Sequence, residues 1–221
     1  MNEIQVLPYT YLTGGHGKQT DEITRVPMFR KWCDRLDPRF KVKSVYIDSY
    51  DDIDGKMQFI KFHSADQAYG KRQVVFMRGD SVGMLVILRS GGRDYAVMTK
   101  QARLAVGVFE HLEIPAGSMD GDGTFLGAAA REIKEELDID IHPDTLIELL
   151  PNTRDEHYRG IAISPGACDE RMRFFYTVRS VTSEELVDFE GKCTGLHEEG
   201  EFITLTIIPI ESIINVPDAK S

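Results

Sequence analysis

The sequence has few cysteines and a shortage of positive charge. Its three cysteines, Cys33, Cys168 and Cys193, are odd in number and widely spaced among 221 residues. They match neither a zinc-ligand spacing nor a disulfide framework, so we expect reduced thiols in an intracellular protein. Against 36 Asp and Glu stand only 26 Lys and Arg, which gives a net charge of −10. Nucleic-acid binders usually carry a basic surface, so a nucleic-acid partner is disfavoured.

The chain also lacks a long hydrophobic run. The longest, around "VGMLVIL" (82–88), has the length of a strand and falls short of the roughly 18 residues that a membrane-spanning helix needs. The opening "MNEIQVLPYT" has neither the basic flank nor the apolar stretch of a signal peptide. We therefore predict a soluble cytoplasmic protein with no membrane partner, unless a targeting segment has been removed.

The composition is that of a globular protein, and the first third of the chain predicts a set of elements of its own. Apolar residues make up 42% of the chain, which is enough for a full core. An irregular arm is predicted for residues 1–22, and a helix for 26–36, where the apolar residues have helical spacing. Apolar and polar residues alternate over 41–64 around an Asp54-Gly55 turn signal, and a further strand is predicted over 72–79. Residues 1–80 are therefore predicted to form a small α+β extension with an antiparallel β-hairpin.

From residue 81 onward, predicted strands surround one helix. Apolar runs on both sides of "RSGGRD" (89–94) indicate a hairpin, and 109–119 predicts a strand that ends in a loop. A helix is predicted over 124–138, strands over 172–181 and 200–210, and a last helix from 209. This order predicts a mixed sheet with helices packed on it, an α+β or α-β-α sandwich domain over 81–221.

The predicted helix contains "AAAREIKEEL" (128–137), which gathers negative charge on one face. At about 100° per residue, Glu132, Glu135 and Glu136 share a face opposite to Ile133 and Leu137. Like charges at this spacing disfavour a helix by a few tenths of a kcal/mol. A charged solvent face is the simplest explanation. The alternative is a site for a divalent cation, which prefers hard oxygen ligands on a rigid element.

The stretch "LEIPAGSMDGDGTFLGAAAREIKEELDI" (112–139) resembles the signature of the Nudix hydrolases. The matching positions of this Nudix box are Gly117, Arg131, Glu132, Ile133, Glu135, Glu136 and Ile139. Two positions depart, because Gly123 stands where the family has an isolated Glu and Asp138 where it has a Gly. The missing Glu usually partners the Arg, so Asp120 and Asp122 are possible substitutes.

The resemblance implies a Nudix fold and a metal-dependent chemistry. It makes Glu132, Glu135 and Glu136 ligands of Mg²⁺, for which Mn²⁺ is able to substitute, and adds the backbone carbonyl of Ala116 as a further ligand. Glu136 is also counted among the catalytic residues. Divalent cations relieve the repulsion between a phosphate and its nucleophile, which is why such a reaction needs this set of carboxylates.

Further segments resemble the branch that acts on ADP-ribose and on UDP- or ADP-sugars. They are "LEIPAG" (112–117), "SPGACDE" (164–170) and "GKCTGLHEEGEFI" (191–203). By this resemblance Glu199 is a catalytic base or orients the water, and Glu201 is an outer metal ligand. A solvated acidic turn is the alternative for both, since Gly200 suits a turn.

Three substrate-binding candidates follow from the same resemblance. Arg103 follows a predicted strand, and its guanidinium suits a bidentate contact to phosphate or a contact to the terminal ribose. Glu113 either binds substrate or braces the loop, and bracing is favoured. Arg78 is a candidate from the N-terminal part. For Arg103, an ordinary surface arginine is the alternative.

Together these features predict Mg²⁺-dependent hydrolysis of a nucleoside diphosphate sugar, such as UDP-glucose, ADP-glucose or ADP-ribose. The products are a nucleoside monophosphate and a sugar phosphate. The branch implies a homodimer in which residues 1–80 contribute to dimerisation and to the partner's pocket. Two alternatives are a catalytically weak Nudix-fold module that senses nucleotide sugars and a structural protein with an acidic helix.

Overall fold

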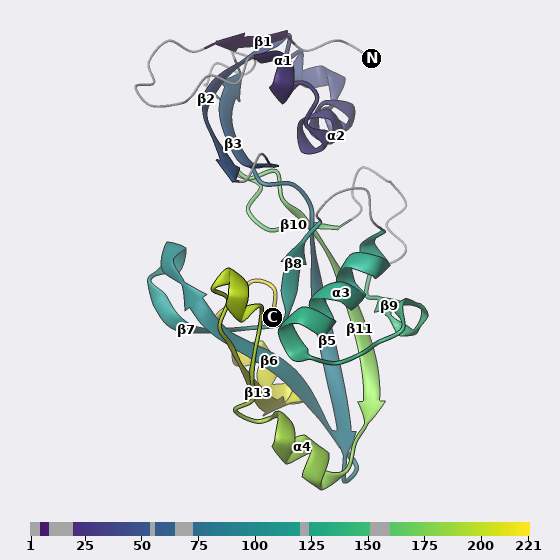
Figure 1. The fold of residues 1–221 in the computed structure, drawn as a ribbon. Coiled ribbons are helices and arrows are strands. Elements are labelled where there is room, and N and C mark those ends of the chain that lie inside the picture. The colour runs from purple at the N-terminus through teal and green to yellow at the C-terminus, as the bar shows by residue number, and fades with distance from the viewer. Residues whose placement is uncertain (1–4, 9–19, 54–55, 65–72, 120–123, 151–159) are drawn as a thin grey trace. The chain divides into compact units, whose positions relative to one another are not determined.

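The computed structural model describes residues 5–8, 20–53, 56–64, 73–119, 124–150 and 160–221 (Figure 1). Their contacts divide the chain into two compact units. The first consists of Met1–Asp80 with Ala162–Arg171, and the second of Ser81–Ile161 with Met172–Ser221. Among the described residues, no helix has the length and apolar character that crossing a membrane requires.

The first unit is built on a four-stranded sheet. Its strands, in spatial order, are β1 (Gln5–Pro8), β2 (Ser44–Ile53), β3 (Lys56–Ser64) and β4 (Val74–Met77). β2, β3 and β4 pair antiparallel, which confirms the predicted hairpin, although its Asp54-Gly55 turn lies outside the described residues. The predicted irregular arm is wrong for Gln5–Pro8, because this segment pairs parallel to β2, a non-local contact that no local pattern indicates. A short helix α1 (Thr20–Ile23) also falls partly within that arm.

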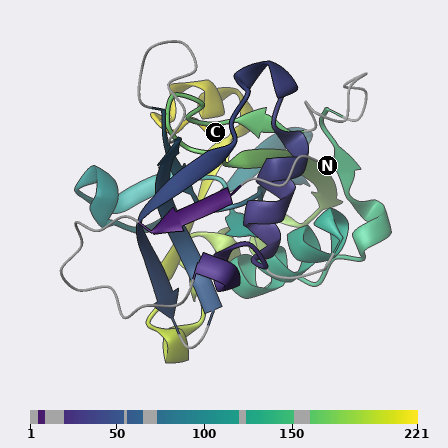
Figure 2. The ribbon, with the colours of Figure 1, turned by 90° about the horizontal axis from the view of Figure 1, so that it is seen from above.

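Helix α2 (Pro27–Arg35) covers this sheet and supplies its core, as the predicted spacing indicated (Figures 1 and 2). Pro27 occupies the first turn, where a missing backbone N–H costs nothing. Phe29 is buried, and the Trp32 ring meets the edge of Phe62 with ring centroids 4.9 Å apart. A single 3-10 turn, η1 (Pro38–Phe40), leads from the helix to β2.

The second unit contains the mixed sheet that the sequence predicted. Its long strands are β5 (Ser81–Ser90), β6 (Arg93–Arg103), β11 (Arg171–Ser180) and β13 (Ile203–Pro209). β7 (Val108–Glu113), β8 (Ala116–Ser118), β9 (Ile147–Glu148), β10 (Ile161–Ala162) and β12 (Cys193–Thr194) are shorter. The path runs β10-β11-β5-β6-β13-β12, with β7 on β6, β8 on β5 and β9 on β11. β11 runs parallel to β5, whereas β6 pairs antiparallel with both β5 and β13.

Two α-helices accompany this sheet, α3 (Phe125–Leu137) and α4 (Ser183–Phe189). The sequence analysis did not predict α4, although Thr182 and Glu185 form a complete capping box at its start. The last helix expected from residue 209 is instead a 3-10 segment, η7 (Ile210–Asn215), which Pro217 prevents from continuing as a helix. Further 3-10 turns are η3 (Leu104–Val106), η4 (Pro143–Thr145) and η6 (His197–Glu199).

Helix α3 is held against the sheet by one apolar stripe. Ala129, Ile133 and Leu137 are fully buried and belong to the same core cluster as Val86 of β5 and Phe175 of β11. Residues spaced three to four apart lie on one face of a helix, so this stripe fixes the rotation of α3 about its axis. Its remaining faces are thereby set relative to the β8 strand, which α3 also contacts (Figure 1).

Candidate active site

The three glutamates of α3 lie in different environments. Glu136 is only 3% exposed, whereas Glu132 and Glu135 are partly buried. A solvated acidic face, the simplest explanation of the sequence pattern, therefore does not describe Glu136. Burying a carboxylate costs free energy unless a partner compensates its charge.

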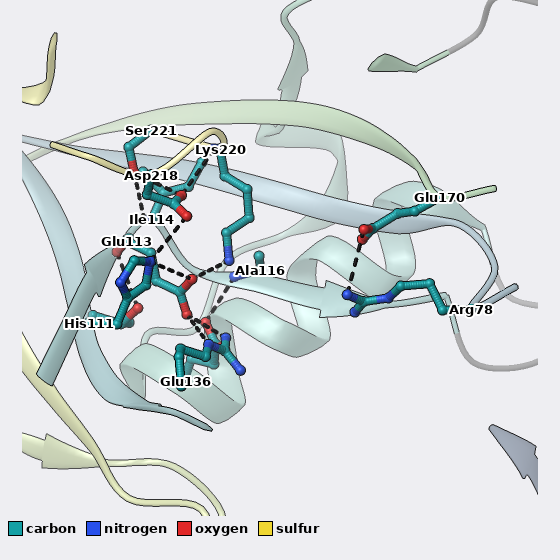
Figure 3. Close-up of polar contacts among 12 residues, drawn as sticks. Arg78, His111, Glu113, Ile114, Ala116, Glu136, Glu170, Asp218, Lys220 and Ser221 are labelled. Carbon is teal, nitrogen blue, oxygen red and sulfur yellow. Dashed lines mark hydrogen bonds and ion pairs between the residues drawn. The ribbon is translucent and has the colours of Figure 1, made fainter. Parts of the chain in front are cut away.

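Glu136 takes part in two hydrogen bonds, one through its carboxylate and one through its main chain. Its Oε2 accepts a hydrogen bond from the backbone N of Ala116 at 3.1 Å (Figure 3), and the Thr194 hydroxyl donates to its main-chain oxygen. Burial raises the pKa of Glu136 to about 8, and the negative charges of Glu132 and Glu201 add to this shift. The hydrogen bond from Ala116 thus places the carboxylate, and among the described residues no cationic group lowers its pKa.

Glu132 lies directly against the backbone of Gly117. A β-carbon at position 117 would come within 1.9 Å of Glu132 Cδ, so only glycine leaves room for this carboxylate. Arg131 Nη2 lies 3.3 Å from Glu132 Oε1 and its Nε lies 3.9 Å from Glu135 Oε1. Burial raises the pKa of Glu132 to about 7, although the charge of Arg131 opposes the rise. The Gly117 loop and the acidic face of α3 thus form one site.

The distant "EEGE" segment contributes at least one carboxylate to this region. The negative charge of Glu201 raises the pKa of both Glu132 and Glu136. Its own Oε2 accepts a hydrogen bond from Leu196 N at 3.3 Å. Glu199 ends the η6 turn, and its side chain lies outside the described part of the structure.

The donor set suits a hard divalent cation. Glu132, Glu135, Glu136 and Glu201 offer carboxylate oxygens, and the fold brings the backbone of Ala116 to Glu136. Like charges around a buried carboxylate are stabilised when a cation binds between them. The glutamates are not packed to ligand spacing, however. Among the described residues, one set of three possible ligands from His, Cys, Asp or Glu has its ligand atoms within 4.8 Å of one another. It consists of His111, Glu113 and Asp218.

Arg103 and Glu113 form an ion pair next to the glutamates. Arg103 Nε donates to Glu113 Oε1 at 2.7 Å, and Nη2 contacts the same oxygen. Glu113 is 2% exposed, and its charge contributes to the raised pKa of Glu136. The bracing role favoured for Glu113 stays a prediction. Its second partner, Lys220, was not among the sequence candidates, and a separation of 107 residues gave no local signal for it.

Arg78 belongs to the first unit. Its Nη1 lies 3.5 Å from Glu170 Oε2, and its backbone N donates to Asp169 Oδ1 at 2.8 Å. Within this unit the "SPGACDE" segment is thus attached to the residues that follow β4, and Phe76 N donates to Ala167 O at 2.7 Å. Arg78 thus lies beside this segment within its own unit, and its substrate-binding role stays a prediction.

One of the two departures from the Nudix box has a structural explanation. Asp138 ends α3 in the left-handed conformation (φ 55°), which normally favours glycine. Lys134 Nζ at 2.9 Å and Lys192 Nζ at 3.0 Å bind its carboxylate and lower its pKa to about 2. Gly123 and the substitutes Asp120 and Asp122 lie outside the described residues, and Arg131 pairs with the glutamates of α3 instead.

A mixed sheet that carries a glycine loop against a helix with an Arg-Glu-x-x-Glu-Glu face defines the Nudix class, and a comparison of sequences agrees. The profile of the NUDIX domain matches residues 77–220. The chain belongs to the Nudix family.

A particular relative is Nudix hydrolase 14, chloroplastic, of Arabidopsis thaliana. It is 35% identical over 199 residues, which cover 84% of this chain and 64% of that protein. The chain therefore spans less than two thirds of its relative's length.

Proposed function

We propose that this chain is a Mg²⁺-dependent pyrophosphohydrolase that cleaves the diphosphate bond of a nucleoside diphosphate sugar. The observation that carries the proposal is the buried Glu136 beside Glu132 at the Gly117 loop, where burial and the negative charge of Glu201 raise the pKa of both carboxylates. An acidic cluster of this kind is costly in a protein that does not bind a cation. Membership of the Nudix family supports the same reaction class.

The metal is assigned to Glu132, Glu135 and Glu136, with Glu201 as an outer ligand and the Ala116 carbonyl as a further donor. When bound, Mg²⁺ neutralises diphosphate oxygens and makes a coordinated water more acidic. Gly117 leaves space for the Glu132 carboxylate, and Ala116 N holds Glu136 in place. Mn²⁺ is expected to substitute, because it accepts the same oxygen ligands.

The reaction is a displacement at phosphorus. The oxygen of a water molecule forms a bond to one phosphorus, the bond from that phosphorus to the bridging oxygen breaks, and a nucleoside monophosphate and a sugar phosphate leave. Glu199 is assigned to accept or orient the water proton. Arg103 is assigned to the phosphate groups, because its guanidinium is held by Glu113 next to the site. Arg78 remains a substrate-binding proposal from the first unit.

The substrate branch rests on the segments that resemble enzymes acting on ADP-ribose and on UDP- or ADP-sugars. We propose a homodimer in which residues 1–80 take part in dimerisation and in the partner's pocket. A cytoplasmic location stays a prediction, while the name of the relative describes that protein as chloroplastic. Light scattering on the purified protein tests the dimer, and a single-chain mass would contradict it.

The test of the reaction is a substrate panel. UDP-glucose, ADP-glucose and ADP-ribose are incubated with Mg²⁺ or Mn²⁺, and both products are identified by chromatography. Glu136→Gln should abolish turnover, whereas Glu184→Gln, which removes one exposed charge from α4, should not change it. Binding of these compounds without product would favour the sensing module over the enzyme. A melting temperature that does not respond to Mg²⁺ would favour the structural acidic helix.

A further inference from the structure

The buried carboxylate of Glu113 is shared by two cations from distant parts of the chain. Arg103 Nε and Nη2 both contact Oε1, whereas Lys220 Nζ contacts Oε2 (Figure 3). Glu113 is 2% exposed and the Lys220 side chain 15%, whereas Arg103 is the most exposed of the three at 38%. The arrangement leaves the guanidinium as the accessible cation of the group.

The geometry of the Arg103 contact is unusual for an arginine and a carboxylate. Such pairs commonly form two parallel hydrogen bonds, one to each carboxylate oxygen. Here both nitrogens of Arg103 converge on Oε1, while Lys220 Nζ contacts Oε2. Lys220 therefore determines which side of Glu113 is available to Arg103, and so the direction in which the guanidinium lies.

Lys220 is itself fixed by contacts around it. Asp218 Oδ1 accepts a hydrogen bond from Lys220 N at 3.0 Å, and Asp218 Oδ2 lies 3.2 Å from His111 Nε2 (Figure 3). Ser221 Oγ accepts from Ile114 N at 3.2 Å. The segment 218–221 is thus attached along β7 and the residue that follows it, so the Lys220–Glu113 pair is more than an occasional surface contact.

This group borders the proposed metal site. Glu113 ends β7, and Ala116, which holds Glu136, begins the next strand in the chain. Figure 3 draws Glu113 and Glu136 in the same region, and the negative charge of Glu113 adds to the raised pKa of Glu136. If the diphosphate of the proposed substrate binds beside the glutamates of α3, the guanidinium of Arg103 would therefore lie close enough to contact one of its phosphate groups.

We propose that Lys220 is a positioning residue for substrate binding, and this inference rests on the proposed function. By holding Oε2 of Glu113, it keeps Arg103 on Oε1 and leaves part of the positive charge of the guanidinium available to the diphosphate. Without Lys220, Arg103 would close onto both oxygens of Glu113 as an ordinary neutralised pair. The His111, Glu113 and Asp218 group is not a second metal site, because Lys220 and Arg103 already occupy the oxygens of Glu113.

The test is a double-mutant cycle in steady-state kinetics, using whichever panel substrate is cleaved best. Lys220→Met should raise KM about tenfold and change kcat less than about threefold, because a binding contact is weakened and the metal ligands are untouched. Lys220→Arg should restore most of the loss. Adding Lys220→Met to Arg103→Met should cost little more, because Lys220 acts through Arg103. Arg93→Met, which removes an exposed charge at the opposite end of β6, is the matched control.

An unchanged KM in Lys220→Met, or effects of the two substitutions that simply add, would overturn the inference. If Lys220→Met does not fold, Lys220→Ala replaces it, since alanine also removes the donor to Oε2. If the wild type cleaves no substrate, the proposed function fails, and two measurements still decide the role of Lys220. Calorimetry should show that Lys220→Met weakens binding of Mg²⁺-pyrophosphate about tenfold, and NMR should show a shifted Arg103 Nε–Hε signal. If Lys220→Met changes neither the pyrophosphate affinity nor the NMR signal, the inference is rejected. It is also rejected if the wild type does not bind pyrophosphate.

Discussion

The carboxylate of Glu132 occupies the space that any side chain at Gly117 would need. The 1.9 Å separation between a β-carbon at 117 and Glu132 Cδ is far below van der Waals contact. The position of Glu132, the first glutamate of the box on α3, thus requires that residue 117 has no side chain. Gly117 has no positive φ, so its role here is close approach and not backbone conformation.

Gly117→Ala should therefore displace Glu132 while the fold persists. We expect activity to fall on the order of 100-fold, the usual effect of a misplacement of about 1 Å at a reacting centre. The matched control is Gly166→Ala, because a β-carbon at 166 would meet nothing within 4 Å. Turnover and circular dichroism of both variants decide the matter, and a fully active Gly117→Ala enzyme would contradict the geometry.

Glu136→Gln should separate stability from activity. Burial is the main cause that raises the pKa of this carboxyl to about 8, so folding near neutral pH must protonate or bury a group that is ionised in the unfolded chain. Glutamine has no charge to lose, so the metal-free variant should melt at a higher temperature. Turnover should fall on the order of 100-fold or more, as when one preorganised electrostatic contact is removed. Calorimetric melting and product release are measured on the same preparation. A lower melting temperature with normal turnover would refute both the electrostatics and the metal-ligand role.

The stability of the metal-free protein should depend on pH with a defined sign. The pKa of Glu136 rises from 4.5 to about 8 on folding and that of Glu132 from 4.5 to about 7. Between these limits the folded state binds more protons than the unfolded state, so the free energy of unfolding falls as pH rises from about 4.5 to about 8. Melting temperatures across this range in a chelating buffer measure the slope. A double Glu132→Gln, Glu136→Gln variant is the control and should lose most of this dependence.

Added Mg²⁺ should act with the opposite pH trend. Cations bind the deprotonated carboxylates, so the rise in melting temperature that Mg²⁺ produces should be larger near pH 8 than near pH 6. The same thermal titration at fixed Mg²⁺ concentrations measures it. An equal rise at both pH values would show that neither Glu132 nor Glu136 competes with protons for the metal.

The helix end at Asp138 offers a test that is independent of catalysis. Asp138→Ala should lower the melting temperature by roughly 2–4 °C, because alanine is strained in the left-handed conformation and cannot bind Lys134 or Lys192. Asp138→Gly removes the strain as well as the carboxylate, so it should melt closer to the wild type. Identical melting of the Ala variant and the wild type would show that this helix end contributes nothing measurable.

The sequence carried the local features of the fold with little ambiguity. Alternation predicted the β2–β3 hairpin, and apolar runs on both sides of a turn predicted the β5–β6 hairpin. Helical spacing predicted α2 and α3 to within about two residues. These features depend on which face of an element is apolar, which a single segment encodes by itself. The Nudix box could be recognised for the same reason, since Gly117 and the residues of α3 follow one another along 23 residues or fewer.

Pairings between segments that are distant in the chain could not be predicted from the sequence. The parallel addition of β1 to β2 and the attachment of Lys220 to Glu113 join segments with no shared local pattern. The short helix α4 was missed although its capping box is visible in the sequence, because seven residues give little periodicity.

By itself, the sequence determined the family and the identity of the carboxylates, because both depend on the order and spacing of residues within short segments. Only the tertiary structure decided that Glu136 is buried, that Glu132 lies against Gly117 and that Arg103 is held on one oxygen of Glu113. Burial and orientation depend on which distant segments pack together. These contacts therefore set the charge and direction of each group, and with them the chemistry that the site can support.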